Sequence, residues 1–276
     1  MRGRLLTASL AVLAFMLASA TASAGSHVSK AASRQSRTSD VAIAGGSVFM
    51  WSKHSGQDSG SGCTLAFSVR SVRTGSKGAL TAGHCVATLN GGPAYFVQQT
   101  QSLPNDSTAP GDLLGKVSGR NYTVGPNGDS AFASLVSGRN ARALLFTGGR
   151  STRTAIPVAG AMDPDTGMQV CYSGAATGEH CGFTIVGGSQ DVSFKSASGH
   201  VTIGNEWRAT GQDCTSRKGD SGSPVYVYNN GFAYAVGILS GGQVKEGQCP
   251  FYFTPVKLAL KVLGLTLITS NSSATS

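Results

Sequence analysis

Three short segments carry side chains that together could cleave an amide bond. They read TAGHC at residues 81–85, NGDSAFASL at 127–135 and GDSGSP at 219–224. Amide hydrolysis needs a nucleophile, a base with a pKa near neutrality, and a partner that fixes the tautomer of the base. Ser221, His84 and Asp129 can fill these roles, which predicts a catalytic triad.

Each of these residues also has an ordinary explanation when it is taken alone. A serine in a glycine-rich turn is usually a turn residue, and an aspartate after Asn127-Gly128 is usually a turn carboxylate. A histidine beside a cysteine is usually packed or solvated. The joint occurrence of the three segments, in the order His, Asp, Ser, favours the catalytic interpretation. The other histidines lie outside these motifs, at positions 27, 54, 180 and 200.

The three segments together resemble the motifs of the chymotrypsin-like serine proteases, in which the residues also follow the order His, Asp, Ser. Within that family the chain is similar to the bacterial branch of streptogrisins and alpha-lytic protease. Similar segments are CYSGAATGEHCG at 171–182, IAGGSVF at 43–49 and SGG at 240–242. The resemblance covers residues 43 to about 269.

This resemblance implies an all-β fold of two six-stranded antiparallel β-barrels, with the active site in the cleft between them. His84 and Asp129 would lie on the first barrel and Ser221 on the second. The amides of Gly219 and Ser221 would donate to the developing oxyanion, because a tight glycine turn can point backbone N–H groups at it. The strand formed by Ser240, Gly241 and Gly242 would bind substrate.

Composition favours the same fold class. The chain has 38 glycines, 7% aromatic and 13% charged residues, which is typical of many short strands and tight turns. Asn229-Asn230-Gly231 separates two apolar runs and predicts a hairpin. The segment PVKLALKVLGLTLI predicts one amphipathic helix followed by a last strand.

We expect five parts along the chain. A basic start, an apolar run and a small-residue end predict a cleaved secretory signal at 1–24, and therefore a secreted, extracellular protein with no membrane anchor once the signal is removed. A polar segment then reads as a linker or short pro-segment. The boundaries that we assign are 1–24 signal, 25–42 linker or pro-segment, 43–148 first barrel, 149–269 second barrel and 270–276 tail.

The six cysteines favour disulfides, because an even count in an exported protein more often marks bridges than metal ligands. The sequence has no C-x-x-C spacing, and Cys85 directly follows His84, which is a poor geometry for ligating one metal together. We therefore expect no metal and no cofactor. A bridge from Cys63 to Cys85 would hold the loop of the base, and one from Cys214 to Cys249 would hold the loop of the nucleophile. Cys171 and Cys181 form the third expected pair.

The formal net charge of +9 is modest for a chain of 276 residues. The densest basic stretch, residues 139–153, contains a single aromatic residue, Phe146, so we expect a solvated surface there and no nucleic-acid site. The expected partners are polypeptide substrates, and the expected state is a monomer.

The sequence departs from the bacterial branch at two positions near the nucleophile. Ser223 replaces a glycine, which keeps a small residue there. Tyr172 replaces an arginine that would pair with Asp220. We therefore expect another partner for Asp220, and a free amino terminus at Ile43 is one possibility.

The substrate preference stays open between two chemistries. Gly241 and Gly242 would leave the pocket mouth open to large side chains, and an apolar pocket would favour aromatic or leucine-like residues. Asp213 turned inward would instead favour lysine or arginine; Gln212 and Thr215 could also line the pocket. Acidic substrates are disfavoured because Leu239, before Ser240, offers no histidine to a carboxylate. The alternative function is that of a catalytically silent homologue that acts as a binding protein.

Overall fold

The structure is a computed structural model. The residues that it describes are 42–46, 48–52, 62–87, 94–97, 113–117, 122–149, 152, 154–196, 199–212, 216–242 and 249–271. The expected signal and all but the last residue of the expected pro-segment lie outside these ranges.

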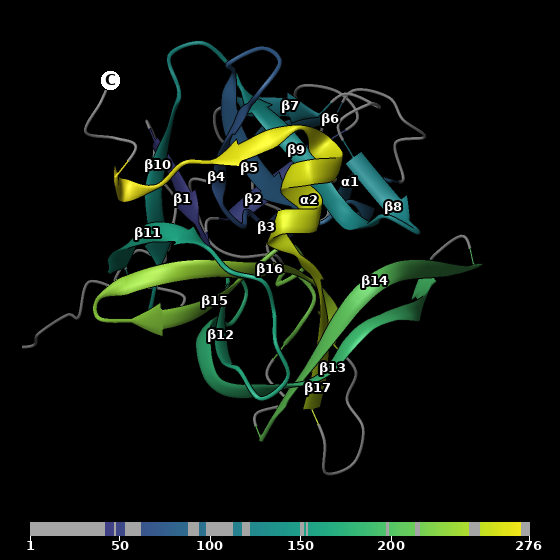
Figure 1. Ribbon diagram of the computed structural model, residues 1–276. Helices are drawn as coiled ribbons and strands as arrows, with labels where there is room; N and C mark the ends of the chain where they lie inside the picture. The colour runs from purple at the N-terminus through teal and green to yellow at the C-terminus, as the bar shows by residue number, and fades with distance from the viewer. Residues whose placement is uncertain are drawn as a thin grey trace, which may run out of the picture. The chain divides into compact units, whose positions relative to one another are not determined.

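One sheet holds most of the strands that follow residue 150 (Figure 1). Its nine strands lie in the order β1 (Ala42–Gly45), β10 (Asn140–Phe146), β11 (Ala155–Ala161), β16 (Phe232–Gly242), β15 (Pro224–Asn229), β12 (Gln169–Gly174), β13 (Gly178–Ser196), β14 (Gly199–Gly211) and β17 (Cys249–Pro255). β16 also pairs with β17. The antiparallel pairings from β16 through β15, β12, β13, β14 and β17 therefore return to β16, as a six-stranded barrel requires.

Two pairings in this sheet are parallel, β1 with β10 and β11 with β16. β1, β10 and β11 lie outside the six-stranded ring, whose own pairings are all antiparallel. In each parallel pairing the two strands are far apart in the sequence, so no hairpin turn sets their relative direction.

The second sheet carries the segments of the proposed base and its partner. In spatial order its strands are β18 (Leu265–Leu267), β4 (Ser68–Ser71), β5 (Lys77–Thr81), β9 (Gly128–Leu135), β7 (Leu113–Val117), β6 (Ala94–Val97), β2 (Val48–Ser52) and β3 (Gly62–Thr64), with β8 (Tyr122–Gly125) paired to β9. All of its pairings are antiparallel. The C-terminal strand β18 thus belongs to the sheet of the first half, while the limits 43–148 and 149–269 stay a prediction.

The predicted local elements at the hairpin and near the C-terminus are confirmed. β15 and β16 are joined by Asn230 and Gly231, whose φ angles of 48° and 84° suit a tight hairpin turn. α2 (Val256–Leu263) ends at Gly264 in the left-handed conformation, and β18 follows. α2 buries Val256 and Ala259 and contacts strands of both sheets, among them β9 and β16 (Figure 1).

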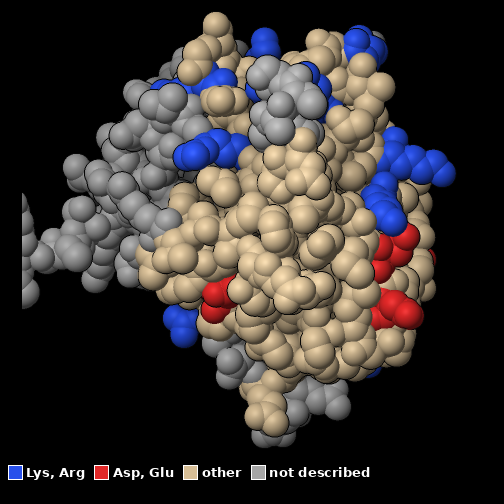
Figure 2. Space-filling model, turned by 60° about the vertical axis from the view of Figure 1, so that its left-hand side comes forward, with Lys and Arg blue, Asp and Glu red and all other residues tan. Residues whose placement is uncertain are grey.

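Basic side chains are scattered over the face shown in Figure 2 and are separated by uncharged surface, with acidic groups at a few places. Among the described residues no helix is both long enough and apolar enough to span a bilayer.

Candidate active site

His84 is placed by a close crossing of two chain segments. β5 ends at Thr81, and the short helix α1 (His84–Ala87) begins two residues after Ala82. Between them a side chain at Gly83 would come within 2.0 Å of the Thr123 carbonyl oxygen, so only glycine fits. The disulfide between Cys63 and Cys85 holds the same turn to β3. His84 therefore lies on a loop that is braced at two points.

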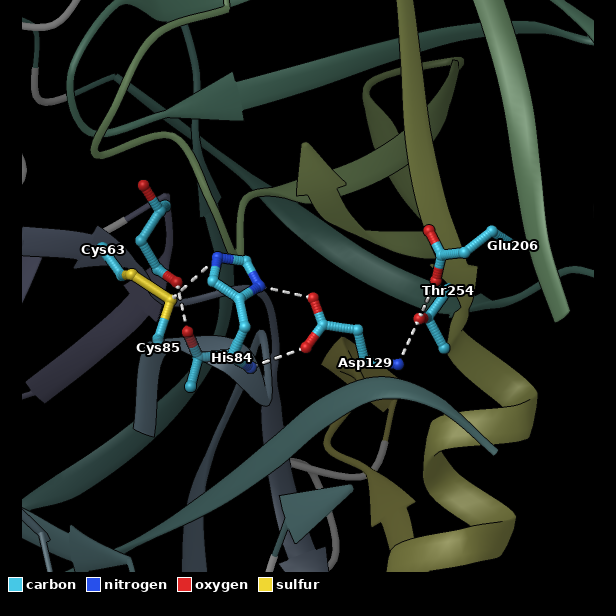
Figure 3. A network of polar contacts seen from close by, with 8 residues as sticks. Cys63, His84, Cys85, Asp129, Glu206 and Thr254 are labelled. Atoms are coloured by element: carbon cyan, nitrogen blue, oxygen red, sulfur yellow. Dashed lines mark hydrogen bonds and ion pairs between the residues drawn. A yellow bond between two sulfur atoms is a disulfide. The ribbon is translucent and has the colours of Figure 1, made fainter. Parts of the chain in front are cut away.

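Asp129 accepts two hydrogen bonds from His84 (Figure 3). Its Oδ2 lies 2.5 Å from His84 Nδ1, and its Oδ1 accepts from the His84 backbone amide at 2.6 Å. The Asp129 side chain is fully buried, whereas that of His84 is 37% exposed. With Nδ1 donating to the carboxylate, Nε2 is the nitrogen that can accept a proton.

The electrostatics of this pair favour a protonated imidazole. Burial acts to lower the pKa of His84, but the charge of Asp129 and its hydrogen bond together outweigh burial and raise that pKa above its ordinary value.

Ser221 lies in a turn that packs directly against the segment before His84. The Thr64 amide donates to the Ser221 carbonyl at 2.8 Å, and the Gly222 amide donates to the Leu239 carbonyl at 2.7 Å. A side chain at Gly222 would meet Thr64 and Thr81 at 2.3–2.4 Å, and its φ is +85°. The serine turn of one sheet is thereby seated between β3, β5 and β16.

The described contacts do not include a hydrogen bond between Ser221 and His84. Among the described residues no hydrogen bond joins Ser221 Oγ to His84, and His84 Nε2 faces Cys85 Sγ at 3.9 Å (Figure 3). Catalytic hydrogen bonds are often long in proteins without substrate and tighten in the complex.

Two amides of the serine turn lack an acceptor. Within the described part of the chain, neither Gly219 N–H nor Ser221 N–H donates a hydrogen bond, whereas the amide of Asp220 between them bonds to the Arg217 carbonyl at 3.0 Å. Gly219 has a φ of 102°, and its carbonyl accepts from Thr64 Oγ1 at 2.7 Å. Two unpaired N–H groups, that of the serine itself and that of the residue two positions before it, suit the stabilisation of an oxyanion.

In the uncleaved chain Asp220 is held by backbone amides and one hydroxyl. Its carboxylate accepts from the amides of Ala176 and Thr177 at 3.1 Å, from Thr177 Oγ1 at 2.9 Å and from the Arg217 amide at 2.9 Å. Ile43 lies within a continuous chain here and pairs with Ala141 in the β1–β10 ladder; a partnership of Asp220 with a free amino terminus at Ile43 stays a prediction. Burial raises the pKa of Asp220, although these hydrogen bonds oppose the shift.

The two substitutions near Asp220 are accommodated by packing. Tyr172 is fully buried and contacts the rings of His180, Phe183 and Phe251. Ser223 is also buried, and its hydroxyl donates to the Asp220 carbonyl at 2.5 Å. Tyr172 thus packs in an aromatic core. The Ser223 hydroxyl adds a hydrogen bond across the turn that contains Ser221.

The proposed substrate strand has two crowded glycines. A side chain at Gly241 would come within 2.9 Å of the Phe194 ring, and one at Gly242 within 2.2 Å of Ser216 Oγ. Ser240, which precedes them, is buried. Phe194 is a residue that the sequence reading did not single out. Asp213, Cys214 and Thr215 lie outside the described residues.

Of the expected bridges, the structure contains Cys63–Cys85 and Cys171–Cys181. Cys249 is disulfide-bonded as well. Among the described residues, Cys63, His84 and Cys85 bring possible metal-ligand atoms within 4.8 Å of one another. The two sulfur atoms of this group form the Cys63–Cys85 disulfide.

Two further polar residues lie behind Asp129 and were not predicted. Thr254 Oγ1 accepts from the Asp129 amide at 2.7 Å and donates to Glu206 Oε1 at 2.5 Å (Figure 3). Both residues are fully buried. Neither lies in a recognisable motif, so only the fold brings them to the site.

A family model described as trypsin matches residues 51–263. The chain belongs to the trypsin family. Serine protease 1 of Rarobacter faecitabidus is 31% identical over 80% of the chain, and streptogrisin-C of Streptomyces griseus is 34% identical over 76% of it. The aligned parts cover only 36% and 39% of those two proteins, so the chain spans little more than a third of their length.

Solved structures support the same fold. Protease A of Thermobifida fusca superposes with a TM-score of 0.55 at 27% identity, and the chymotrypsin of Cellulomonas bogoriensis with a TM-score of 0.57 at 26% identity. Each match covers 83% of this chain and all of the other. The fold is therefore the two-barrel fold of trypsin-like proteases, as the sequence predicted.

Proposed function

We propose that this chain is a secreted serine endopeptidase in which Ser221 is the nucleophile, His84 the general base and Asp129 the residue that orients the base. The observation that carries the proposal is the pair of hydrogen bonds from His84 to the buried Asp129, beside a serine turn that packs on the same strands. Membership of the trypsin family supports it. The leader and the disulfides support export.

The proposed reaction uses each of these groups in turn. His84 Nε2 takes the proton of Ser221 Oγ as the oxygen attacks the scissile carbonyl carbon, and the oxyanion accepts from the Gly219 and Ser221 amides. His84 then gives this proton to the leaving amine as the C–N bond breaks. The acyl group stays on Ser221 Oγ as an ester. Water, activated by the same imidazole, hydrolyses this ester and restores the serine.

The test is labelling with a serine-directed phosphonate, followed by mapping of the modified residue. We expect a single adduct on Ser221 and parallel loss of peptidase activity. Absence of labelling in a folded chain would favour the silent homologue that acts as a binding protein.

For the substrate class we propose large apolar side chains. The supporting observation is the aromatic ring of Phe194 against Gly241, which gives the substrate strand an apolar neighbour. Cleavage rates after Phe, Leu, Lys, Arg and Glu in otherwise identical peptides test this. Preference for Lys or Arg that is lost in Asp213→Asn would favour the basic alternative.

A further inference from the structure

Glu206 is a buried acid that the proposed reaction does not use. It lies on β14 with no exposed side-chain surface, and its neighbour Asn205 has a φ of 60°. The register of β14 against β13 shifts on both sides of Glu206. Such a bulge can redirect a side chain from the regular alternation, and here it places a carboxyl inside the protein.

The carboxyl lies in a line of groups that leads to the base (Figure 3). Glu206 Oε1 accepts from Thr254 Oγ1, so the threonine lone pair is free to accept from the Asp129 amide, and Asp129 in turn holds His84. A hydroxyl placed between a donor and an acceptor has its proton direction fixed. Glu206 therefore determines the orientation of Thr254.

The other carboxyl oxygen has no partner of good geometry. Glu206 Oε2 and Ser240 Oγ are both buried without a hydrogen bond among the described residues. The Ser240 hydroxyl nevertheless acts on the Glu206 carboxyl, because it opposes the rise of the carboxyl's pKa. A proton on Oε2 would pair both atoms by donating to Ser240, on the strand that we assign to substrate binding.

The charge state of Glu206 follows from its surroundings. Burial, and then the charge of Asp129, raise the pKa of Glu206 to about 8, although the hydroxyls of Thr254 and Ser240 oppose the shift. The charge that acts on Glu206 is that of Asp129 on β9. Ser240 on β16 and Thr254 on β17 present hydroxyls, and β13 places the neutral Gln190 opposite Glu206 in the ladder. At neutral pH the carboxyl is a hydrogen-bond donor.

We propose that neutral Glu206 is a positioning residue of the reaction, which holds Asp129 through Thr254 and holds Ser240 through its own O–H. This inference rests on the proposed peptidase function. Ionisation of Glu206 would remove the donor to Ser240 and set a second buried negative charge beside Asp129, and both changes disturb the orientation of the base.

The first test compares the pH dependence of kcat in the wild-type chain and in Glu206→Gln. At one pH unit above the pKa about nine tenths of Glu206 is ionised, so wild-type kcat should fall about tenfold between pH 7 and pH 9. Glutamine keeps an acceptor and a donor but cannot ionise. We expect Glu206→Gln to have about a third of wild-type kcat at pH 7 because its N–H bonds are longer, and to stay within about twofold of that value at pH 9.

The second test addresses the link through Thr254. Thr254→Val keeps the shape and removes the hydroxyl, which should lower kcat at pH 7 by about tenfold or more with little change in KM. Thr254→Ser keeps the hydroxyl and should restore most of the loss. Asp191→Asn, which removes an exposed carboxyl on β13, is the matched control and should leave kcat and its pH profile unchanged.

All turnover values are divided by the concentration of sites that react with the phosphonate, so that unfolded protein does not count. If kcat declined above pH 8 in Glu206→Gln as it does in the wild type, the role of Glu206 would be overturned while the proposed function would stand. A lack of recovery in Thr254→Ser would have the same meaning. A wild-type chain that is folded but neither reacts with the phosphonate nor cleaves peptides would overturn the proposed function and this inference with it.

Discussion

The imidazole of His84 must be neutral to take the proton of Ser221, so its pKa limits the proposed activity on the acid side. Burial opposes the shift, but the charge and hydrogen bond of Asp129 raise this pKa. We therefore expect kcat/KM to rise with pH, with a midpoint above the ordinary histidine value of about 6.5. Initial rates on one peptide from pH 5 to pH 8 measure it, and a midpoint below pH 6 would contradict the assigned pair.

Ser221 and His84 act as one unit in the proposed reaction, because the base is useful only with its nucleophile. Ser221→Ala and His84→Ala should each lower kcat by about 10⁴-fold or more, and the double variant should lose no more than either alone. Steady-state kinetics on purified, folded variants check this. Ser137→Ala, an exposed serine in a turn, is the control, and additive losses would argue against a shared mechanism.

Motifs in the sequence are the basis on which we propose Ser221 and His84, whereas residues that only the fold brings to them carry no such signal. GDSGSP and TAGHC point to Ser221 and His84 because the glycines and the cysteine around them meet local needs that are visible in the sequence. Glu206 has no such neighbours, since its burial depends on a bulge at Asn205 and on the approach of β17. Two residues that bond to Asp220, Ala176 and Thr177, are hidden for the same reason, because they come from the turn between β12 and β13.

At the level of elements, the approach of β17 to β9 depends on Gly128. This residue has a φ of +89°, and a side chain there would lie 2.6 Å from Thr254 Cγ2. Gly128→Ala should thus cost about 2–3 kcal/mol of stability, from backbone strain together with the clash, and should lower kcat by displacing Thr254. Urea unfolding and peptide kinetics measure the two effects.

Gly138→Ala separates strain from the clash. Gly138 has a φ of +82° and open space around it, so its substitution should cost only about 1 kcal/mol and leave kcat unchanged. Equal losses of stability at the two positions, with activity retained in both, would show that the contact between Gly128 and Thr254 is unimportant.

Local elements were predictable where a turn or a repeat of apolar residues defines them. The β15–β16 hairpin and the α2–β18 segment follow from Asn-Gly chemistry and helical periodicity. The parallel pairings of β1 and β11, and the return of β18 to the first sheet, were not predictable from local sequence. They pair segments far apart in the chain, and no turn sets their register.

For the molecule as a whole, three groups at the candidate site, Glu206, Asp220 and His84, hold protons more tightly than they would in an unfolded chain. The pKa values of Glu206 and Asp220 are raised mainly by burial, and that of His84 by Asp129 against the effect of burial. A group with a raised pKa stabilises the fold fully below its unfolded pKa, and this contribution disappears as pH rises through its folded pKa. All three shifts therefore act in the same direction.

We therefore expect the folded protein to lose stability between about pH 5 and pH 9, with the loss due to Glu206 falling between its ordinary value of 4.5 and about 8. The measurement is the urea midpoint of Ser221→Ala at several pH values, a background that prevents self-cleavage. Adding Glu206→Gln should flatten the decline, whereas adding Asp191→Asn should not, because that carboxyl is exposed. A midpoint that rises from pH 6 to pH 9, or a decline that is as steep without Glu206 as with it, would mean that Glu206 does not keep its proton in the folded protein.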